Sequence, residues 1–369
     1  MNVTDPIAGN GPHRTPIHFV LWRAEPGGME NYAASYVRHF RSSRRTYLFS
    51  LRPGPNDLTD EVDGYSTGYA SNRAMYTAYF RYCRSYRRDR FHLLNSGPVL
   101  LLLTLLAGVR RPVYHIHGTL FWKGTIDRWF LRCVWWMTLP FRPVFVANSH
   151  YTAAIFKRTA APGEPVVVSN GFDATSLLAG RRHRIQLRRM AYVGRMAPRK
   201  NAELAVRAFD AIAGSFPELE LHFAGTGPEE DHVRQHALSS PYRRRIFFHG
   251  WVKDMPAFYA SVDLVLFPSS HESFGNVLAE AIINGLPVLT SDLPAFAEIH
   301  GDRPTFSLGA PLEGTVFIRN FVAAVERYPE LAEKVFALSG PFAERFDMGK
   351  HLSRIERIHV DAELASKRA

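Results

Sequence analysis

The sequence predicts an α/β protein of two domains, each built from a parallel sheet with helices packed against it. At 369 residues the chain is longer than a single core usually serves, so two domains are expected. Its composition, 46% hydrophobic and 21% charged, is that of a globular chain and not of a disordered one. Short apolar runs alternate with segments of helical period along the whole chain, and no internal repeat is evident beyond this alternation.

The net charge and the cysteine content limit which binding partners and which cellular compartment are expected. The net charge of +11 and the pI of about 9.8 favour anionic partners: nucleotides, nucleic acid or an anionic membrane surface. The two cysteines, Cys83 and Cys133, have no neighbours at metal-ligand spacing, which indicates a reduced, cytoplasmic setting. Residues 1–14 have the polar composition of a flexible tail and lack the apolar core of a signal peptide. The longest apolar run, residues 99–109, is too short to span a bilayer and predicts a buried helix.

The first domain opens with an expected strand over 17–22, and Gly27 and Gly28 follow at the start of a helical pattern. A glycine pair there lets the backbone approach a bulky ligand, although a lone pair often marks only a tight turn. A later expected strand covers residues 112–118, and His117, beside Gly118, stands at its carboxyl end. Ligands bind at the carboxyl ends of strands in open α/β sheets. A structural histidine is the alternative, and a metal ligand is disfavoured because no third ligand lies near in sequence. The other strands expected in this domain cover 46–51, 144–147 and 166–169.

Two stretches of the first domain combine aromatic and basic residues. Residues 81–90 are dense in arginine with tyrosines between them, which fits a solvated helix face or a patch for phospholipid headgroups or an anionic acceptor. Between residues 128 and 142, arginines accompany five large aromatic residues, a mixture suited to a membrane interface. Core packing explains the same tryptophans, and we expect at least half of these tryptophans to be buried. The five aromatic residues are Trp129, Phe130, Trp135, Trp136 and Phe141.

The second domain is expected to carry strands over 190–193, 219–224, 246–249 and 262–268. The last of these runs into a loop and then into a helical pattern from about Asn276. Free amide groups at this helix start, together with the positive end of the helix dipole, make a site for phosphate.

Two glutamates, Glu272 and Glu280, flank this helix start with seven residues between them. A carboxylate beside a phosphate site would repel the phosphate, so its natural partner is a neutral, hydroxyl-rich group such as a sugar or a ribose. For an isolated pair of this spacing, an N-cap region followed by a solvent-facing Glu is the commoner explanation. The strand, the loop, the two acids and the anion-binding helix end together indicate a nucleotide-sugar pocket.

The stretch ESFGNVLAEAIINGLPVL, which begins at Glu272, resembles the E-x7-E signature of the large retaining glycosyltransferase family 4, the group 1 glycosyl transferases. The order of motifs is similar over about residues 15–365. The resemblance implies the GT-B fold, two Rossmann-like domains facing a central cleft. The implied division is a flexible tail 1–14, an acceptor domain 15–174, a linker 175–188, a donor domain 189–350 and a final helix 351–369 that crosses back to the first domain.

The resemblance also implies roles for single residues. Glu272 would hold hydroxyls of the donor sugar and Glu280 those of the ribose. Arg195 and Lys200 would bind the diphosphate, whose leaving charge needs a cation if no metal is present. His117 would contact the transferring sugar, and Gly118 stands where the family commonly has Asp. The other implied donor contacts are Gly27, Gly28, Trp251, Val252, Ser273, Phe274, Gly275, Asn276, Val277 and Leu278.

We therefore expect a retaining, hexosyltransferase-type enzyme (EC 2.4) in which His117, Glu272, Arg195 and Lys200 act in catalysis. It would move a sugar from a UDP- or GDP-linked donor to a hydroxyl of a glycan or lipid-linked acceptor, in cell-surface polysaccharide or glycolipid synthesis. No metal and no cofactor are expected, since the chain has no D-x-D pair of the metal-dependent class. The expected location is cytoplasmic, with peripheral contact at the inner face of an anionic membrane.

Two alternatives stay open at this stage. One is a catalytically silent nucleotide-sugar-binding or scaffolding subunit with the same fold, which Gly118 favours. The other is a nucleic-acid binder, prompted by the net charge, although no signature of such a protein is found in the sequence.

Overall fold

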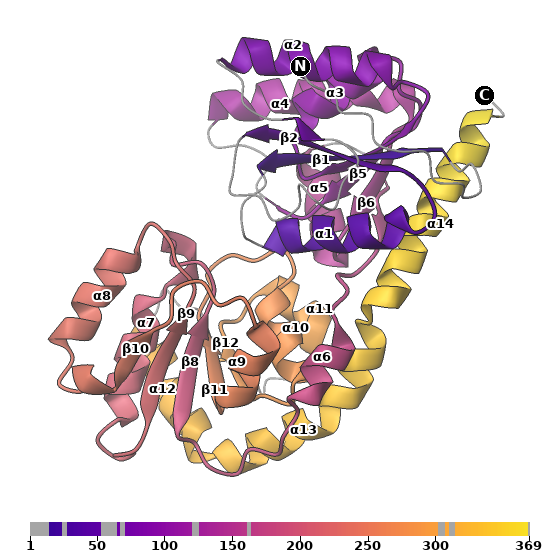
Figure 1. Cartoon of the computed structure of the whole chain (residues 1–369). Coiled ribbons are helices and arrows are strands. Elements are labelled where there is room, and N and C mark those ends of the chain that lie inside the picture. The colour runs from indigo at the N-terminus through magenta and orange to yellow at the C-terminus, as the bar shows by residue number, and fades with distance from the viewer. Residues whose placement is uncertain are drawn as a thin grey trace. The chain divides into compact units, whose positions relative to one another are not determined.

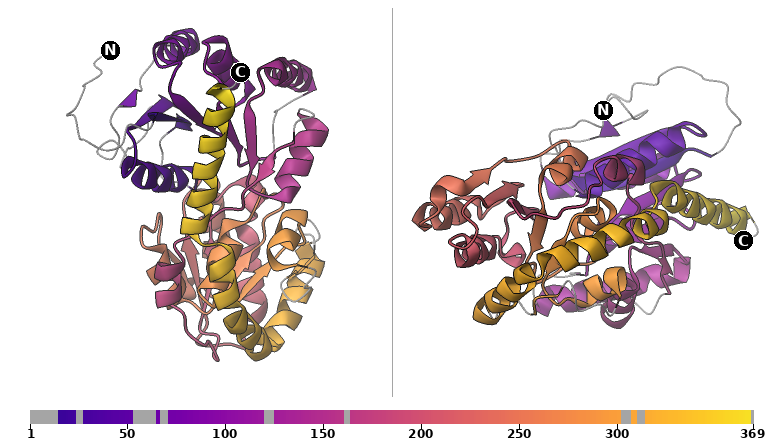
Figure 2. Two further views of the ribbon diagram at one scale, coloured as in Figure 1. Left: turned by 90° about the vertical axis from the view of Figure 1, so that its right-hand side faces the viewer. Right: turned by 90° about the horizontal axis from the view of Figure 1, so that it is seen from below.

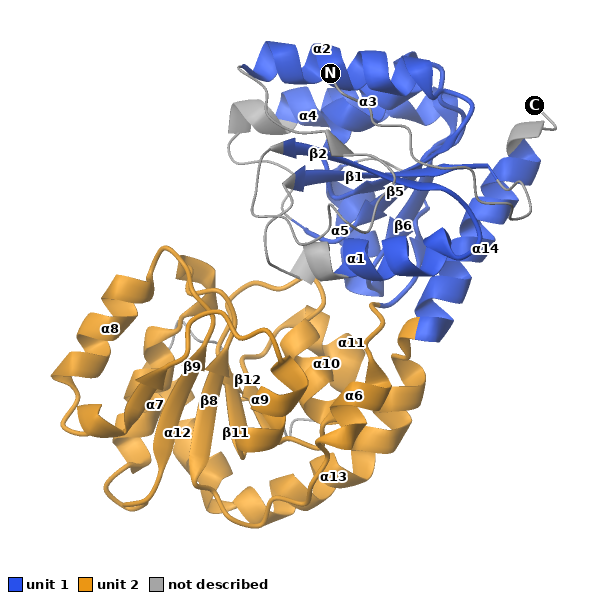
Figure 3. Ribbon diagram, viewed as in Figure 1, with its two compact units in different colours: residues 1–169, 349–369 blue, residues 170–348 orange. Residues whose placement is uncertain are grey.

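The computed structural model describes residues 15–23, 28–52, 65–66, 71–119, 125–160, 164–301, 307–309 and 314–367. The chain divides into two compact units, residues 1–169 with 349–369 as unit 1 and residues 170–348 as unit 2 (Figure 3). Each unit contains one parallel sheet with helices packed against it, as the fold class predicts (Figures 1 and 2).

Unit 1 has a seven-stranded parallel sheet within the described residues, in the order β3-β2-β1-β4-β5-β6-β7. Its strands are β1 (Ile17–Arg23), β2 (Thr46–Arg52), β3 (Tyr65–Ser66), β4 (Arg90–Leu94), β5 (Val113–Ile116), β6 (Val144–Ala147) and β7 (Val166–Val167). Its helices are α1 (Gly28–Arg41), α2 (Asn72–Ser85), α3 (Pro98–Leu106), α4 (Thr125–Thr138), the 3-10 helix η2 (Leu139–Phe141), α5 (His150–Thr159) and α14 (Met348–Lys367).

Most of the strands expected in unit 1 are confirmed, and the buried helix expected over 99–109 is α3. Strand β4 was not predicted, because Arg90 and His92 interrupt its apolar pattern. Both side chains are nevertheless buried. The Arg90 guanidinium donates to the carbonyl of Arg111 at 3.4 Å, and the His92 ring lies 3.1 Å from that of His359. Buried polar residues that have partners in the core thus interrupt the apolar pattern by which a strand is recognised in a sequence.

The structure corrects two expectations about the basic and aromatic stretches of unit 1. Residues 81–90 form no single helix face, because they run from the end of α2 through a turn into buried Arg90. Of the three tryptophans between 129 and 136, only Trp135 is buried, so the prediction that at least half of them would be buried was wrong, and Phe130 and Phe141 are exposed as well. Helix α4 contributes a narrow face to the interior, which includes Val134, Trp135 and Thr138.

Unit 2 has a five-stranded parallel sheet within the described residues, in the order β10-β9-β8-β11-β12. Its strands are β8 (Arg189–Val193), β9 (Glu220–Ala224), β10 (Ile246–Phe248), β11 (Leu264–Phe267) and β12 (Val288–Thr290). Its helices are α6 (Ala174–Ala179), η3 (Pro198–Lys200), α7 (Glu203–Ile212), α8 (Glu230–Ser239), η4 (Arg243–Arg245), α9 (Met255–Ser261), α10 (Asn276–Ile283), α11 (Pro294–His300), α12 (Gly314–Glu326) and α13 (Tyr328–Arg345). The strands expected from the sequence of this unit are all present, within two residues at either end.

The stretch 175–188, expected to be a linker, is an integral part of unit 2. It lies mostly in α6 and in an irregular segment that contains the buried Arg184. The Arg184 guanidinium donates to the carbonyls of Tyr259 (2.9 Å) and Val262 (2.8 Å) and to the side chain of Asn284 (2.7 Å). Since Tyr259 lies near the carboxyl end of α9 and Asn284 directly follows α10, this cation joins the negative ends of two helices.

No helix in the described part of the chain combines the length and the apolar character that crossing a membrane requires.

Candidate functional site

The strand order of unit 2 reverses direction between β8 and β11, which are hydrogen-bonded neighbours in the sheet. In parallel sheets of this kind, ligands bind outside the carboxyl ends of the strands at such a switch point. The segment after β8 carries Arg195 and Lys200, and the segment after β11 carries Glu272. Residues predicted from distant parts of the sequence are therefore brought to one edge of one sheet.

Lys200 and Glu272 form an ion pair across this edge, between Nζ and Oε1. The Ser269 hydroxyl donates to the same carboxylate oxygen at 2.9 Å. The two loops are also joined by their backbones, because the Ser270 amide donates to the carbonyl of Arg199 at 2.8 Å. Both charged side chains keep some contact with water, 27% exposed for Lys200 and 13% for Glu272, so a ligand can reach them.

The start of α10 has the features expected of an anion site. Gly275 precedes the helix with φ of 104°, a conformation that side-chain-bearing residues rarely adopt. A Cβ atom at this position would also lie 2.6 Å from the ring of Phe296. Within the described part of the chain, the amides of Gly275, Asn276 and Val277 donate to no protein acceptor. These donors lie at the positive end of the helix dipole and can bind phosphate oxygens.

Glu280 lies one turn inside α10, which begins directly after Gly275. The Tyr259 hydroxyl donates to its Oε2 atom at 2.7 Å. Burial raises the pKa of Glu280 above its usual value, and the hydrogen bond from Tyr259 works in the opposite direction. The bond occupies one carboxylate oxygen from the protein side, which leaves Oε1 to accept hydrogen bonds from a ligand.

The other residues predicted for the donor site in unit 2 range from exposed to fully buried. Arg195 is exposed, and its carbonyl accepts a hydrogen bond from the Tyr192 hydroxyl at 3.1 Å. Trp251 is 46% exposed and Val252 is half-buried, in the loop between β10 and α9. Phe274 is buried and its ring lies near Phe172 and Phe346, which indicates a role in the core. Ser273 and Val277 are half-buried, and Leu278 is fully buried in the core.

In unit 1, His117 directly follows β5 as predicted. Its ring centroid lies 4.1 Å from that of His115 and 5.6 Å from that of Tyr32. Burial, with a smaller contribution from the charge of His351, lowers the pKa of His117 to about 3, so its imidazole is neutral near pH 7. Gly28 begins α1, whereas Gly27 lies outside the described residues.

A chain of hydrogen bonds joins the strands of unit 1 to α14 next to His117. The Tyr36 hydroxyl lies 3.3 Å from Nδ1 of His115 and 2.7 Å from Nε2 of His351. Nδ1 of His351 in turn donates to the carbonyl of Ser169 at 2.7 Å. Burial lowers the pKa of His351 to about 4. Among the described residues, no three His, Cys, Asp or Glu side chains are grouped as metal ligands would be.

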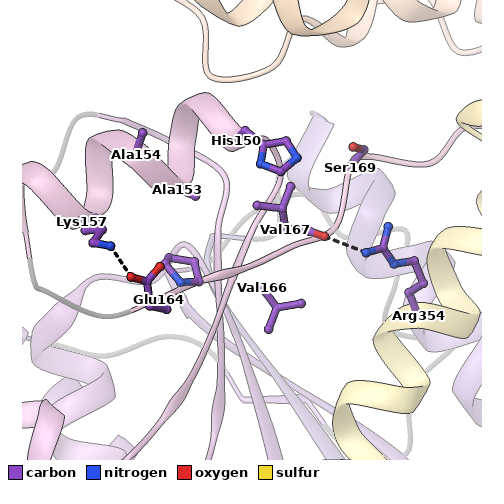
Figure 4. A pocket seen from close by; sticks show the side chains of 10 residues that line it. His150, Ala153, Ala154, Lys157, Glu164, Val166, Val167, Ser169 and Arg354 are labelled. Atoms are coloured by element: carbon purple, nitrogen blue, oxygen red, sulfur yellow. Dashed lines mark hydrogen bonds and ion pairs between the residues drawn. The ribbon is translucent and has the colours of Figure 1, made fainter.

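A cavity of about 530 Å³ in unit 1 is lined by none of the predicted site residues. It is lined by α5, the region of β7 and Arg354 of α14 (Figure 4). Its cations already have partners in the protein. Lys157 pairs with Glu164, and Arg354 donates to the carbonyl of Val167 at 3.0 Å. We therefore base the function on the sheet edge of unit 2 and not on this cavity.

Sequence reasoning missed three side chains that hold the predicted acids and the helix start. They are Ser269, which donates to Glu272, Tyr259, which donates to Glu280, and Asn170, whose amide donates to Oδ1 of Asn276 at 2.8 Å. Ser269 lies only three residues before Glu272 and could have been found as its local donor. Nothing in the sequence pairs Tyr259 with Glu280 or Asn170 with Asn276.

Two family models match the chain, one in each half. Residues 26–176 match the model described as Glycosyltransferase Family 4, and residues 188–335 match the model described as Glycosyl transferases group 1. Together the two models cover most of the chain.

Curated relatives match over shorter stretches. The glycogen synthase of Mycobacterium tuberculosis (strain H37Rv) is 30% identical over 138 residues, which are 37% of this chain and 33% of the relative. The phosphatidyl-myo-inositol mannosyltransferase of Mycobacterium leprae is 30% identical over 165 residues, 44% of this chain and 43% of the relative. The matched stretch thus spans less than half the length of each of these relatives.

Solved structures match over nearly the whole chain. The structure of Anabaena Alr3699/HepE in complex with UDP-glucose has a TM-score of 0.75 at 18% identity, covering 94% of this chain and 100% of that one. The structure of WaaG, a glycosyltransferase involved in lipopolysaccharide biosynthesis, has a TM-score of 0.73 at 17% identity, covering 93% and 99%. At these identities the likeness establishes the fold alone.

Proposed function

Because this chain belongs to glycosyltransferase family 4, the group 1 glycosyl transferases, we propose that it transfers a sugar from a nucleotide-sugar donor to a hydroxyl group of an acceptor. The observation that carries the proposal is the edge of the unit 2 sheet. There an acid paired with a lysine, a second acid held by a tyrosine and a helix start with unpaired amides come together.

In the proposed donor complex, the amides at the start of α10 bind the diphosphate together with Lys200 and Arg195. The free oxygen of Glu280 accepts hydrogen bonds from ribose hydroxyls, and Glu272 holds hydroxyls of the sugar. Lys200 has two roles, since it both orients Glu272 and carries the positive charge that the leaving diphosphate needs. Trp251 and Val252 are the proposed contacts of the base.

We propose a retaining reaction without a metal ion. The bond between the anomeric carbon and the phosphate oxygen breaks as the acceptor hydroxyl forms its bond on the same face of the sugar. The departing phosphate oxygen takes the proton of that hydroxyl, so no separate general base is required. His117, neutral at pH 7, would act as a hydrogen-bonding group to the sugar and not as a cation.

A UDP- or GDP-linked hexose is the proposed donor, and the UDP-glucose in the HepE structure puts UDP-sugars first among the candidates to test. The proposed acceptor is a glycan or lipid-linked hydroxyl, in cell-surface polysaccharide or glycolipid synthesis. We also propose that the protein lies in the cytoplasm and acts at the inner face of an anionic membrane.

Thermal unfolding in the presence of UDP-, GDP- and ADP-sugars tests donor binding. A ligand at a hundred times its dissociation constant stabilises the folded state by about 2.7 kcal/mol, which is readily seen as a rise in Tm. We expect one base to raise Tm, Glu280→Gln to abolish most of that rise, and the exposed Glu326→Gln to leave it unchanged. If none of these sugars changes Tm, the donor site is wrongly assigned.

One observation favours a second candidate, a nucleotide-sugar-binding subunit without turnover. Gly118 stands beside His117, so this position offers no acidic side chain. Release of nucleoside diphosphate from a donor that raises Tm distinguishes the two candidates. Binding without release, with and without glycan acceptors, would support the silent subunit.

A further inference from the structure

Helix α4 and the following η2 present a continuous apolar strip to solvent. Exposed fractions are 67% for Trp129, 62% for Phe130, 50% for Trp136, 55% for Met137 and 44% for Phe141. Within α4, Trp129 and Trp136 are seven residues apart, as are Phe130 and Met137, and the exposed Cys133 lies between the two pairs, so helical period places these five side chains along one side of the helix, with Phe141 following in η2. Contiguous exposed apolar surface of this kind marks an interaction site, because single exposed apolar residues are normal but a strip of them is not. We call these six residues the α4 strip.

The part of unit 1 that contains the α4 strip is strongly basic. Residues 71–160 hold fourteen Lys and Arg but only two acidic residues, so this stretch carries a formal charge of +12, against +11 for the whole chain. The excess charge of the protein is therefore concentrated in one quarter of its sequence. Helix α2, which ends in this basic region, packs on α3, and α3 packs on α4 (Figure 1). Exposed arginines of this region include Arg81, Arg84, Arg87, Arg88 and Arg142.

We propose that the α4 strip docks into the headgroup region of an anionic lipid bilayer. Tryptophan and phenylalanine are the side chains that favour this depth, where a helix parallel to the surface buries its apolar side. The exposed arginines of the same region match the phosphates of anionic lipids with their planar forks. A second copy of the chain is a poor occupant, because two such surfaces placed together would bring two charges of +12 against each other.

The single exposed cysteine provides a reporter within the strip itself. The chain has two cysteines, and Cys83 is fully buried with a pKa raised by that burial to about 12. A thiol-reactive, environment-sensitive dye should therefore label Cys133 alone. When vesicles of phosphatidylcholine and phosphatidylglycerol are added, we expect dye emission to rise and shift to shorter wavelength. Vesicles of phosphatidylcholine alone should have a much weaker effect.

Co-sedimentation with the same vesicles provides the quantitative test on unlabelled protein. The double variant Trp129→Gln with Trp136→Gln should bind anionic vesicles at least about tenfold more weakly than the wild type, because two aromatic anchors are lost. Leu238→Gln is the matched control, since Leu238 is 61% exposed on α8 of unit 2 and should change nothing. Far-UV circular dichroism and Tm confirm that each variant is folded.

Several results would overturn the proposal. Unchanged dye emission with anionic vesicles would do so, as would undiminished vesicle binding by the folded double variant. A dimer in sedimentation that the double variant loses, without vesicle binding by the wild type, would assign the strip to a second copy instead. Capture of an acidic protein by a chain that ignores vesicles would assign it to a protein partner.

Docking of the α4 strip would provide the membrane contact that the proposed function includes, but this docking does not require sugar transfer. The double variant should keep the Tm rise caused by the matching nucleotide sugar. Loss of the nucleotide effect with vesicle binding intact would therefore count against the proposed function alone. The reverse pattern would count against the α4 strip alone.

Discussion

Replacing Lys200 with alanine is the sharpest perturbation of the proposed donor site. The change removes the cation that pairs with Glu272 and leaves that carboxylate with the Ser269 hydroxyl as its described partner. Loss of one preorganised group that stabilises developing charge raises the barrier by about 2–4 kcal/mol. At 1.36 kcal/mol for each factor of ten, this is a loss of about 30-fold to 900-fold in kcat.

The assay is steady-state release of nucleoside diphosphate with the donor that raises Tm. Lys334→Ala removes an exposed lysine of α13 in the same unit and should leave kcat within experimental error. Lys200→Arg keeps the charge and should recover part of the lost rate. A Lys200→Ala variant that is folded and turns over at nearly the wild-type rate would refute the role given to this cation. A rate that falls only in proportion to the folded fraction would do the same.

Three further predictions follow from contacts in the structure. Tyr259→Phe removes the hydroxyl that orients Glu280 and should weaken nucleotide binding about tenfold by calorimetry, with a smaller loss for a 2′,3′-dideoxy nucleotide. Gly275→Ala should lower the free energy of unfolding by more than about 1 kcal/mol in urea titrations, because φ is 104° and the new Cβ would meet the Phe296 ring. Burial lowers the pKa of His92 and His117 to about 3 and that of His351 to about 4, whereas an unfolded histidine titrates near 6.5. The unfolded chain therefore binds more protons below pH 6.5, and stability should fall as pH drops from about 6.5 toward 4, by up to about 1.4 kcal/mol per pH unit for each of the three. Urea unfolding measured across this range checks the slope, and a flat profile would contradict the buried, neutral state of these rings.

The sequence predicted the fold, and the positions of the candidate site residues in it, wherever local pattern and tertiary structure agree. Strand β11, the glycine before α10 and the two acids lie within one short stretch, so their relation is local and could be read directly. Apolar strands buried on both faces are likewise evident from composition, as in β6 and β8.

Contacts between distant segments could not be predicted in this way. The ion pair of Lys200 with Glu272 joins residues 72 positions apart, and it exists because β8 and β11 are neighbours in the sheet. The hydrogen bond from Tyr259 to Glu280 depends on how α9 packs near α10, which no periodicity encodes. The direction of the aromatic residues of α4 was also misjudged, because composition reports hydrophobicity but not which face of a helix the core covers.

Calorimetric titration with the matching nucleotide sugar, in EDTA and again with added Mg²⁺ or Mn²⁺, tests the central claim most directly. If Lys200, Arg195 and the amides of α10 hold the diphosphate without a metal, the dissociation constant will be the same in both solutions. The Glu280→Gln variant should have a dissociation constant that is raised by the same factor in both solutions. Binding that disappears in EDTA and returns with the divalent ion would contradict the claim.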